Sequence, residues 1–283
     1  MKIRMKIIFK VLILFFPFLL FSQNSSMIKE LDGAQKKIFL ELITNDAKVS
    51  LFSIQHQLYL DSLIAILPKE PFFWQQKAMP LFKQKKYELG MKYLDKAIEL
   101  DPTDHYREYR AFIKCVFQKN YSESLEEFNY LTKINGDDGV IMDHPYSFWM
   151  GLCYLQLNEF DKAKNFIEKS IVFGQKNNFV NPYELFYLGI IEYEKENYQN
   201  AINNFNKSLE QYENFSDAKY YKALSLLNLN KKEEGQILLL EANNDFKNGF
   251  TFNEGNSLYE QFPYQVSNFM YMFATGYQKS EIP

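Results

Sequence analysis

The segment PFFWQQKAMPLFKQKKYELGMKYLDKAIELDP, residues 71–102, determines the fold. Two small side chains, Ala78 and Gly90, stand on either side of a lysine-rich break at residues 83–86. Large apolar side chains surround each small residue at the three- and four-residue spacing of a helix that buries one face. The segment is therefore predicted to form two helices joined by a tight turn, with the helix axes close together at the small residues.

The same pattern occurs five times between residues 71 and 249. In each second helix a small residue is followed four positions later by a large apolar residue, which places both on one helix face. The small residues are Gly90, Ser124, Ala163, Ala201 and Gly235, and the large ones are Leu94, Phe128, Ile167, Phe205 and Leu239. The units start at Pro71, His105, His144, Asn181–Pro182 and Ser216, with spacings of 34, 39, 38 and 34 residues. The extra residues, 136–140 and 173–180, are predicted to be loops between repeats.

The first unit matches a known pattern most closely. It has Trp74, Ala78, Leu81, Tyr87, Gly90, Leu94, Ala97 and Pro102 at the expected offsets. In these residues the chain resembles the tetratricopeptide repeat family, whose unit is a helical hairpin of about 34 residues. The resemblance implies an all-α fold, a right-handed α-solenoid of tandem helix-turn-helix repeats with N- and C-terminal caps. The arrangement is also similar to uncharacterised exported repeat proteins of Bacteroidetes, which adds no activity.

Three departures from the pattern lead to specific expectations. Pro80 lies inside the first helix of the first unit, where it should kink or break that helix because it has no N–H to donate. Phe112 stands where a small residue is expected. Either Ala111 takes that role with a turn one residue longer, or the two helices are spread apart. Lys232 replaces the usual aromatic residue, as is typical of a terminal repeat with one less buried side.

Both flanks of the repeats are predicted to cover the ends of the solenoid. Residues 24–70 have helical composition and are interpreted as capping helices or as a degenerate repeat. Residues 250–283 contain nine aromatic side chains and are broken by glycine and proline, so they are predicted to be a cap or a tail that docks on an apolar surface.

The first 23 residues have the features of a secretory signal peptide. Four basic residues and no acidic one accompany an apolar run from Val11 to Phe21. At 1.5 Å per residue that run spans about 16 Å, roughly half of a bilayer core. The protein is therefore expected to be exported, either periplasmic or secreted, with no integral membrane span after signal removal. An uncleaved N-terminal anchor is the alternative, because Leu20 is not the small residue that cleavage prefers.

The composition excludes several functional classes. A net charge of −3, near −7 after signal removal, argues against a nucleic-acid partner. Cys115 and Cys153 cannot form a disulfide scaffold and are predicted to be buried free thiols. The sequence has no catalytic motif, so no catalytic residue, metal site or cofactor is expected and the protein is predicted not to be an enzyme. Asp143 before His144 is interpreted as the N-cap of a helix.

Three positions of each first helix are predicted to face a ligand on the concave side of the repeats. They are largely aromatic, which suggests a binding surface, although such rings can also pack on one another. The predicted binding residues are Phe72, Gln75, Tyr106, Tyr109, Arg110, Phe148, Trp149, Tyr183, Phe186, Tyr187, Tyr220 and Tyr221. The surface has few basic groups, which disfavours a clamp for a terminal carboxylate.

The expected function follows from this surface. We favour an exported scaffold that binds a protein or peptide segment in an aromatic-lined groove. The alternatives are a carbohydrate-binding protein or an accessory protein of envelope assembly. About ten partly exposed rings would form an unusually large apolar patch. This motivates the hypothesis that the chain's own aromatic tail, residues 250–283, occupies the groove in the isolated protein.

Overall fold

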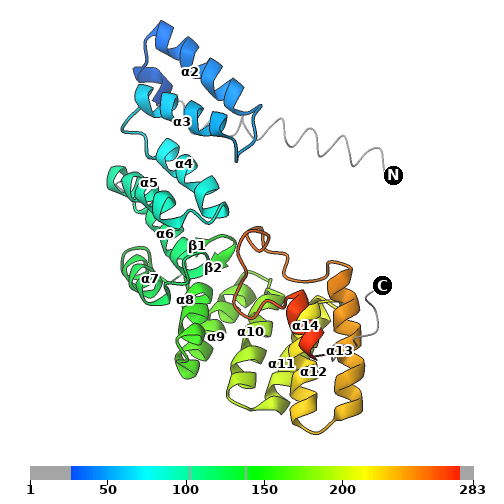
Figure 1. The fold of residues 1–283 in the computed structure, drawn as a ribbon. Coiled ribbons are helices and arrows are strands. Elements are labelled where there is room, and N and C mark those ends of the chain that lie inside the picture. The colour runs from blue at the N-terminus through cyan, green and yellow to red at the C-terminus, as the bar shows by residue number, and fades with distance from the viewer. Residues whose placement is uncertain (1–26, 102, 138, 275–283) are drawn as a thin grey trace, which may run out of the picture. The chain divides into compact units, whose positions relative to one another are not determined.

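The computed structural model describes residues 27–101, 103–137 and 139–274. The predicted signal peptide lies outside the described residues. The chain divides into two compact units, residues 1–102 and 103–283. Figure 1 follows the chain through both units, and helices dominate each of them.

The first unit contains two helical hairpins. Its elements are the 3-10 helix η1 (Met27–Glu30) and the helices α2 (Gly33–Asp46), α3 (Ile54–Ile66), α4 (Pro71–Lys83) and α5 (Tyr87–Leu100). The α2 helix begins with a capping box, because Asp32 accepts from the Gln35 amide while the Gln35 side chain accepts from the Asp32 amide. Phe39, Leu60 and Phe73 form one buried cluster that joins α2 and α3 to the start of α4.

The expected break at Pro80 does not occur, because α4 continues as one helix to Lys83. Only the last turn of the helix follows this proline. Packing explains the tolerance: Pro80, Leu81 and Phe82 are all buried, so apolar contact compensates for the hydrogen bond that Pro80 cannot donate.

The second unit contains the four remaining repeats. Its elements are α6 (His105–Val116), α7 (Tyr121–Asn135), β1 (Val140–Ile141), β2 (His144–Pro145), α8 (Tyr146–Gln156), α9 (Phe160–Lys176), α10 (Pro182–Glu194), α11 (Tyr198–Gln211), α12 (Ser216–Asn228), α13 (Lys232–Lys247) and α14 (Asn268–Ala274). Helices α6 to α13 pair in sequence as first and second helices of successive repeats, which confirms the all-α repeat architecture.

The turn inside each repeat has one feature that the sequence pattern did not reveal. In all five repeats the residue two positions before the second helix is left-handed, with φ close to +60°. These residues are Lys85, Lys119, Asn158, Glu196 and Asn230. A single left-handed residue reverses the chain so that the second helix returns along the first. The recurrence of this conformation shows that the five turns are structurally equivalent.

The small residues bring the two helices of a repeat together, as predicted. A Cβ atom added to Gly189 on α10 would lie 2.4 Å from the Phe205 ring on α11. One added to Gly151 on α8 would lie 2.6 Å from the Ile167 side chain on α9. Both distances are shorter than a carbon–carbon contact, so any larger residue at these positions would require the Phe205 ring or the Ile167 side chain to shift.

The second repeat resolves the alternatives for Phe112. Ala111 faces α7, since the Ser124 hydroxyl donates to the Ala111 carbonyl at 2.8 Å. The turn between α6 and α7 contains residues 117–120, one more than the three residues that separate the helices of the other repeats. Ala111 therefore takes the role of the small residue with a longer turn.

The two predicted loops between repeats are only partly correct. The first contains a short antiparallel pair, in which Ile141 of β1 lies opposite His144 of β2. The second is shorter than expected, because α9 continues through residues 173–176. The proposed N-cap at Asp143 is wrong: α8 begins at Tyr146, and Asp143 adopts φ +62° in the turn between the strands.

After α13 the chain forms an extended segment rather than another repeat. It runs from the end of α13 toward β2 and returns to α14, as Figure 1 shows in orange and red. We call residues 250–271 the C-terminal strap. Residues 250–258 are its outbound leg and residues 259–271 its return leg.

Candidate functional site

Seven of the predicted binding residues lie on three successive first helices of the second unit. We call this set the aromatic face, and it comprises Phe148 and Trp149 on α8, Tyr183, Phe186 and Tyr187 on α10, and Tyr220 and Tyr221 on α12. Each ring is at most 7% exposed. The rings that were expected to face a ligand are therefore buried in this structure.

Part of this burial comes from contacts within the aromatic face. Phe148 packs edge-on against Tyr187 with ring centroids 5.7 Å apart, which joins α8 to α10. Phe186 packs in the same way against Tyr221 at 6.0 Å, which joins α10 to α12. Edge-to-face pairs of this kind contribute about 1 kcal/mol beyond burial. The aromatic face is thus continuous over three repeats.

The outbound leg of the strap covers one end of the aromatic face. Phe252 stacks on Tyr183 with centroids 4.7 Å apart and lies 5.4 Å from Phe186. The next amide of the strap, that of Asn253, donates to the Tyr183 hydroxyl at 2.9 Å. Tyr183 therefore binds the outbound leg both by ring stacking on Phe252 and by a hydrogen bond from the backbone of Asn253.

The return leg covers the middle of the aromatic face. Phe262 lies 6.3 Å from Trp149, and Tyr264 lies 5.8 Å from Tyr221. Between them, the Tyr187 hydroxyl donates to the Pro263 carbonyl at 2.9 Å. Burial raises the pKa of the Tyr187 phenol well above its usual value, so the hydroxyl stays protonated and remains a donor.

The end of the return leg is fixed by Tyr271 of α14. Its ring packs edge-on against Tyr220 at 5.1 Å, and its hydroxyl donates to the Ser216 carbonyl at 3.1 Å. Phe246 of α13 lies on the same ring at 5.2 Å. This contact anchors the strap to both helices of the last repeat.

Asp217, the second residue of α12, is a polar anchor beneath the strap. Its side chain is fully buried and accepts from the Val266 amide and the Thr251 hydroxyl, both at 2.7 Å, and from the Ser216 hydroxyl at 3.1 Å. Burial raises the pKa of this carboxyl to about 6, although the three hydrogen bonds oppose the rise. Asp217 therefore contacts both legs of the strap and titrates in a range close to neutral pH.

His144 provides a second polar contact with the strap. Its Nε2 lies 3.0 Å from a carboxylate oxygen of Glu254, and its ring stacks on Phe148 at 3.9 Å. The histidine side chain is almost completely buried. His144 thus links the β2 strand, the aromatic face and the tip of the outbound leg.

Sequence reasoning missed both polar anchors. Asp217 is the only charged residue in a row whose other members are Phe72, Tyr106, Pro145 and Tyr183, and that exception was the available signal. His144 was assigned to a helix start, and its partner Glu254 is 110 residues away in the sequence, so no local pattern connects them.

Three further predicted residues lie on α6, and one of them reaches the aromatic face through Phe112, whose ring centroid lies 5.0 Å from that of Trp149. Tyr109 is buried against Phe112, with centroids 6.0 Å apart, and Tyr106 is half-buried beside His105. The Arg110 guanidinium lies 2.8 Å from the Glu127 carboxylate, which also accepts from Lys114. Arg110 is therefore part of an ion-pair network between α6 and α7 rather than a clamp for a ligand.

Phe72 and Gln75 belong to α4 of the first unit. Phe72 packs on the buried cluster at the start of α4, 5.4 Å from Phe73. The Gln75 side chain accepts from Gln76 at 2.8 Å.

A pocket of about 520 Å³ lies beside the return leg. The repeats contribute Lys119, Tyr121 and Gln156, and the strap contributes Gln261, Tyr264 and Gln265. The Tyr121 hydroxyl donates to the Gln156 side chain at 3.2 Å, and both residues are half-buried. Amides, aromatic rings and the charged side chains of Lys119 and Glu260 therefore line space that the strap does not fill.

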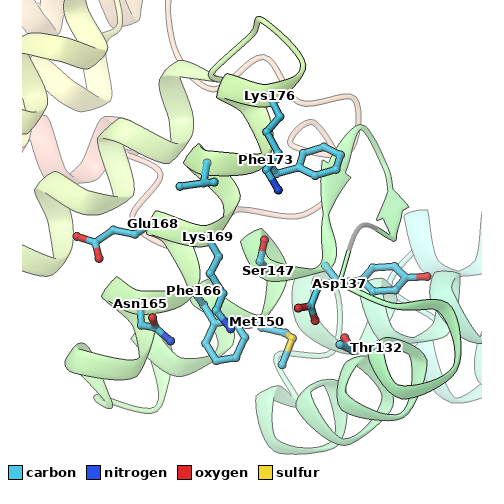
Figure 2. A pocket seen from close by; sticks show the side chains of 12 residues that line it. Thr132, Asp137, Ser147, Met150, Asn165, Phe166, Glu168, Lys169, Phe173 and Lys176 are labelled. Carbon is cyan, nitrogen blue, oxygen red and sulfur yellow. The ribbon is translucent and has the colours of Figure 1, made fainter.

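A separate pocket of about 340 Å³ lies against α7, α8 and α9, and Figure 2 shows the side chains that line it. Lys169 and Lys176 are accompanied by Asp137 and Glu168, so positive and negative charges are mixed. None of the predicted binding residues lines this pocket.

No metal site or membrane-spanning helix is found in the part of the chain that the structure describes. Within residues 27–101, 103–137 and 139–274, no group of three or more His, Cys, Asp and Glu side chains could hold a metal ion. No helix in these ranges is long and apolar enough to cross a bilayer. Cys115 and Cys153 are buried free cysteines, and their side chains are hydrogen-bonded to each other.

Comparison with known proteins identifies the repeats. A family model described as tetratricopeptide repeat matches residues 73–104 and 144–171. No curated protein matches the sequence.

Several solved structures share the fold at low identity. PilW, a widely conserved type IV pilus biogenesis factor, is 13% identical, with a TM-score of 0.59 over 81% of this chain and 99% of PilW. PilF of Pseudomonas aeruginosa is 14% identical, with a TM-score of 0.54 over 76% of this chain and 91% of that chain. Yeast Tom70 is 18% identical, with a TM-score of 0.52 over 68% of this chain and 39% of that chain.

Proposed function

Because the chain is a tetratricopeptide repeat protein, we propose that it is an exported scaffold that binds a protein or peptide segment through the aromatic face. One observation carries this proposal. An extended segment already lies on the face, with its backbone hydrogen-bonded to Tyr183, Tyr187 and Asp217. A surface that holds one extended backbone in this way has the chemistry to hold another.

In this proposal the strap is the intramolecular occupant of the aromatic face. It shields rings that would otherwise form a large apolar patch on a solvated protein. Deleting residues 250–283 should therefore expose apolar surface and increase dye binding or aggregation. If the truncated protein stays monomeric and binds no more dye than the full chain, the strap is not the occupant.

A crosslinking experiment tests partner binding. A photoreactive phenylalanine analogue at Tyr121, which lines the pocket beside the strap, should capture a partner in cells that produce the protein. The same analogue at Tyr130, an exposed residue of the same helix α7, serves as the matched control. Identical products from the two positions, or none from either, would contradict binding at the aromatic face.

Export rests on the basic and apolar N-terminal sequence. Mass spectrometry of the protein from fractionated cells should find a mature N-terminus near Ser22 or Gln23. A chain that retains Met1 in the membrane fraction would instead indicate an uncleaved anchor.

Carbohydrate binding is the second candidate, and the pocket beside the return leg favours it. Tyr121 and Tyr264 lie there with the side chains of Gln156, Gln261 and Gln265, a combination of aromatic rings and amides that suits a sugar. Calorimetry with oligosaccharides and with peptides would separate the two candidates, because only the true ligand class should give saturable heat.

A role as an accessory protein of envelope assembly is compatible with either ligand. PilW is a type IV pilus biogenesis factor, which suggests this context, although a likeness at 13% identity reaches only the fold. We propose a scaffold rather than an enzyme, and turnover in a broad panel of hydrolase substrates would contradict that.

A further inference from the structure

The repeats hold the backbone of the return leg at three points. The Tyr187 hydroxyl donates to the Pro263 carbonyl at 2.9 Å, and the Val266 amide donates to the Asp217 carboxylate at 2.7 Å. The Lys119 ammonium donates to the Gln261 carbonyl. Backbone groups are common to all polypeptides, so these contacts would also hold a segment of another chain.

The side chains of the return leg show which residue types the face accepts. Phe262 and Val266 are at most 3% exposed, and Pro263 between them is buried as well. Tyr264 is half-buried against Tyr221. The order is thus aromatic, proline, aromatic, any residue, β-branched, with no charged side chain from residue 261 to residue 266.

The electrostatics of the face disfavour an acidic segment. Asp217 is fully buried beneath the return leg, and a second carboxylate nearby would be repelled in this poorly solvated environment. Its carboxylate instead requires a backbone N–H, which excludes proline at the position of Val266.

The return leg does not fill the available space, whereas the outbound leg fits closely. The open pocket of about 520 Å³ adjoins the return leg, with Tyr121 and Gln156 on its far side. By contrast, Phe252 of the outbound leg has four rings of the repeats around it, those of Tyr183, Phe186, Tyr187 and Phe215. The return leg is therefore the part of the strap that a longer or bulkier segment could replace.

We propose that the partner of the aromatic face is an extended, uncharged segment of another polypeptide with the pattern aromatic-Pro-aromatic-x-β-branched. It replaces residues 261–266 while the outbound leg stays docked, and it continues into the pocket lined by Tyr121 and Gln156. This inference rests on the function proposed above and adds the chemistry of the partner.

The test uses the full chain with a specific protease site inserted after Leu258, which is 87% exposed at the tip of the strap. Cleavage leaves the return leg in place but no longer covalently joined to the outbound leg. An uncharged fluorescent peptide with the sequence of residues 261–268, acetylated at its N-terminus, is then added, and its anisotropy is followed. The peptide should bind the cleaved protein saturably and should bind the uncleaved protein at least ten-fold more weakly.

Two modified peptides test the backbone contacts. Methylation of the amide nitrogen of Val266 removes the donor to Asp217 and should weaken binding more than ten-fold, because hydrogen bonds to a buried charge are strong. Methylation of the Gln261 nitrogen is the matched control. This amide has no hydrogen-bond partner among the described residues, so binding should be unchanged. In the variant Asp217→Ala, methylation at Val266 should cause no further loss of peptide affinity. If that variant does not fold, the comparison of the two methylated peptides on the unsubstituted protein still tests the contact.

The outcomes separate this inference from the proposed function. Equal binding of the Val266-methylated peptide, or of a peptide with Phe262→Asp, would overturn the inferred pattern. If an unrelated acidic or basic peptide binds the cleaved protein instead, the function stands and the pattern is wrong. If no peptide binds, the proposed function and this inference both fail.

Discussion

The repeats and the strap close the second unit in different ways. Within a repeat, Gly189 packs against Phe205 in an apolar contact, and a turn with a recurrent left-handed residue joins their two helices. The strap meets the repeats across long stretches of sequence, such as the 76 residues between Tyr187 and Pro263, and uses buried polar groups to hold a backbone. Local contacts of the first kind define the helical hairpins, whereas contacts of the second kind are the ones that a partner would replace in the function proposed above.

The largest effect is expected from a change inside a repeat. Gly189→Leu places a side chain where even a Cβ atom would lie 2.4 Å from Phe205, so the two helices must separate. We expect the free energy of unfolding to fall by more than about 3 kcal/mol in urea denaturation followed by circular dichroism. Gly255→Ala is the control, because no atom lies within 4 Å of its added Cβ. Equal midpoints for the two variants would show that the repeat contact is not close.

A smaller decrease in the free energy of unfolding is expected from a change in the strap. Phe252→Ala removes a ring that is 4% exposed, but the strap can detach once its own docking free energy is lost. The cost should therefore be about 2 kcal/mol, below the 3–5 kcal/mol typical of a phenylalanine in a rigid core. Limited proteolysis should cut residues 255–259 faster while the helical signal is retained. Loss of helical signal together with cleavage would mean that strap and repeats are one cooperative unit.

The pH dependence of stability tests the buried anchor. The pKa of Asp217 is about 6 in the folded protein, against an ordinary value of 3.8, so its stabilising effect is complete below pH 4 and is lost as the pH rises through 6. Between pH 7 and pH 5 this group should add about 1 kcal/mol to stability. The difference between the wild type and Asp217→Asn in urea unfolding isolates the contribution. If the difference in unfolding free energy between the two proteins does not change with pH, the raised pKa of Asp217 is contradicted.

The smallest effect is expected at the thiols. Cys115 and Cys153 lie on α6 and α8, whereas the repeat rings around Phe252 belong to α10 and to Phe215, the N-cap of α12. Phe252→Ala should therefore leave the slow reaction of the native thiols with a disulfide reagent unchanged. Both thiols should react once the protein is unfolded. Faster reaction in the folded variant would indicate that the strap also holds the second and third repeats together.

The repeats could be predicted from the sequence because their contacts are local. The offsets of Gly189 and Phe205 within one unit determine which helix faces are in contact. At the exceptional Phe112, one of the two expected alternatives, Ala111 as the small residue with a longer turn, is correct. The path of the strap could not be predicted. Its aromatic residues indicated docking, but the bonds of Asp217 to Val266 and of His144 to Glu254 join distant segments. Only the folded chain brings these groups together.

The left-handed turn residues have a consequence for engineering. A side chain in this conformation costs about 1 kcal/mol relative to glycine, and asparagine tolerates it better than lysine or glutamate. Lys85 and Glu196 occupy two of these turns without such tolerance. Replacing both residues with glycine should raise the thermal stability of the protein without changing any residue of the aromatic face. Variants weakened by changes at the binding surface can be rescued with these substitutions.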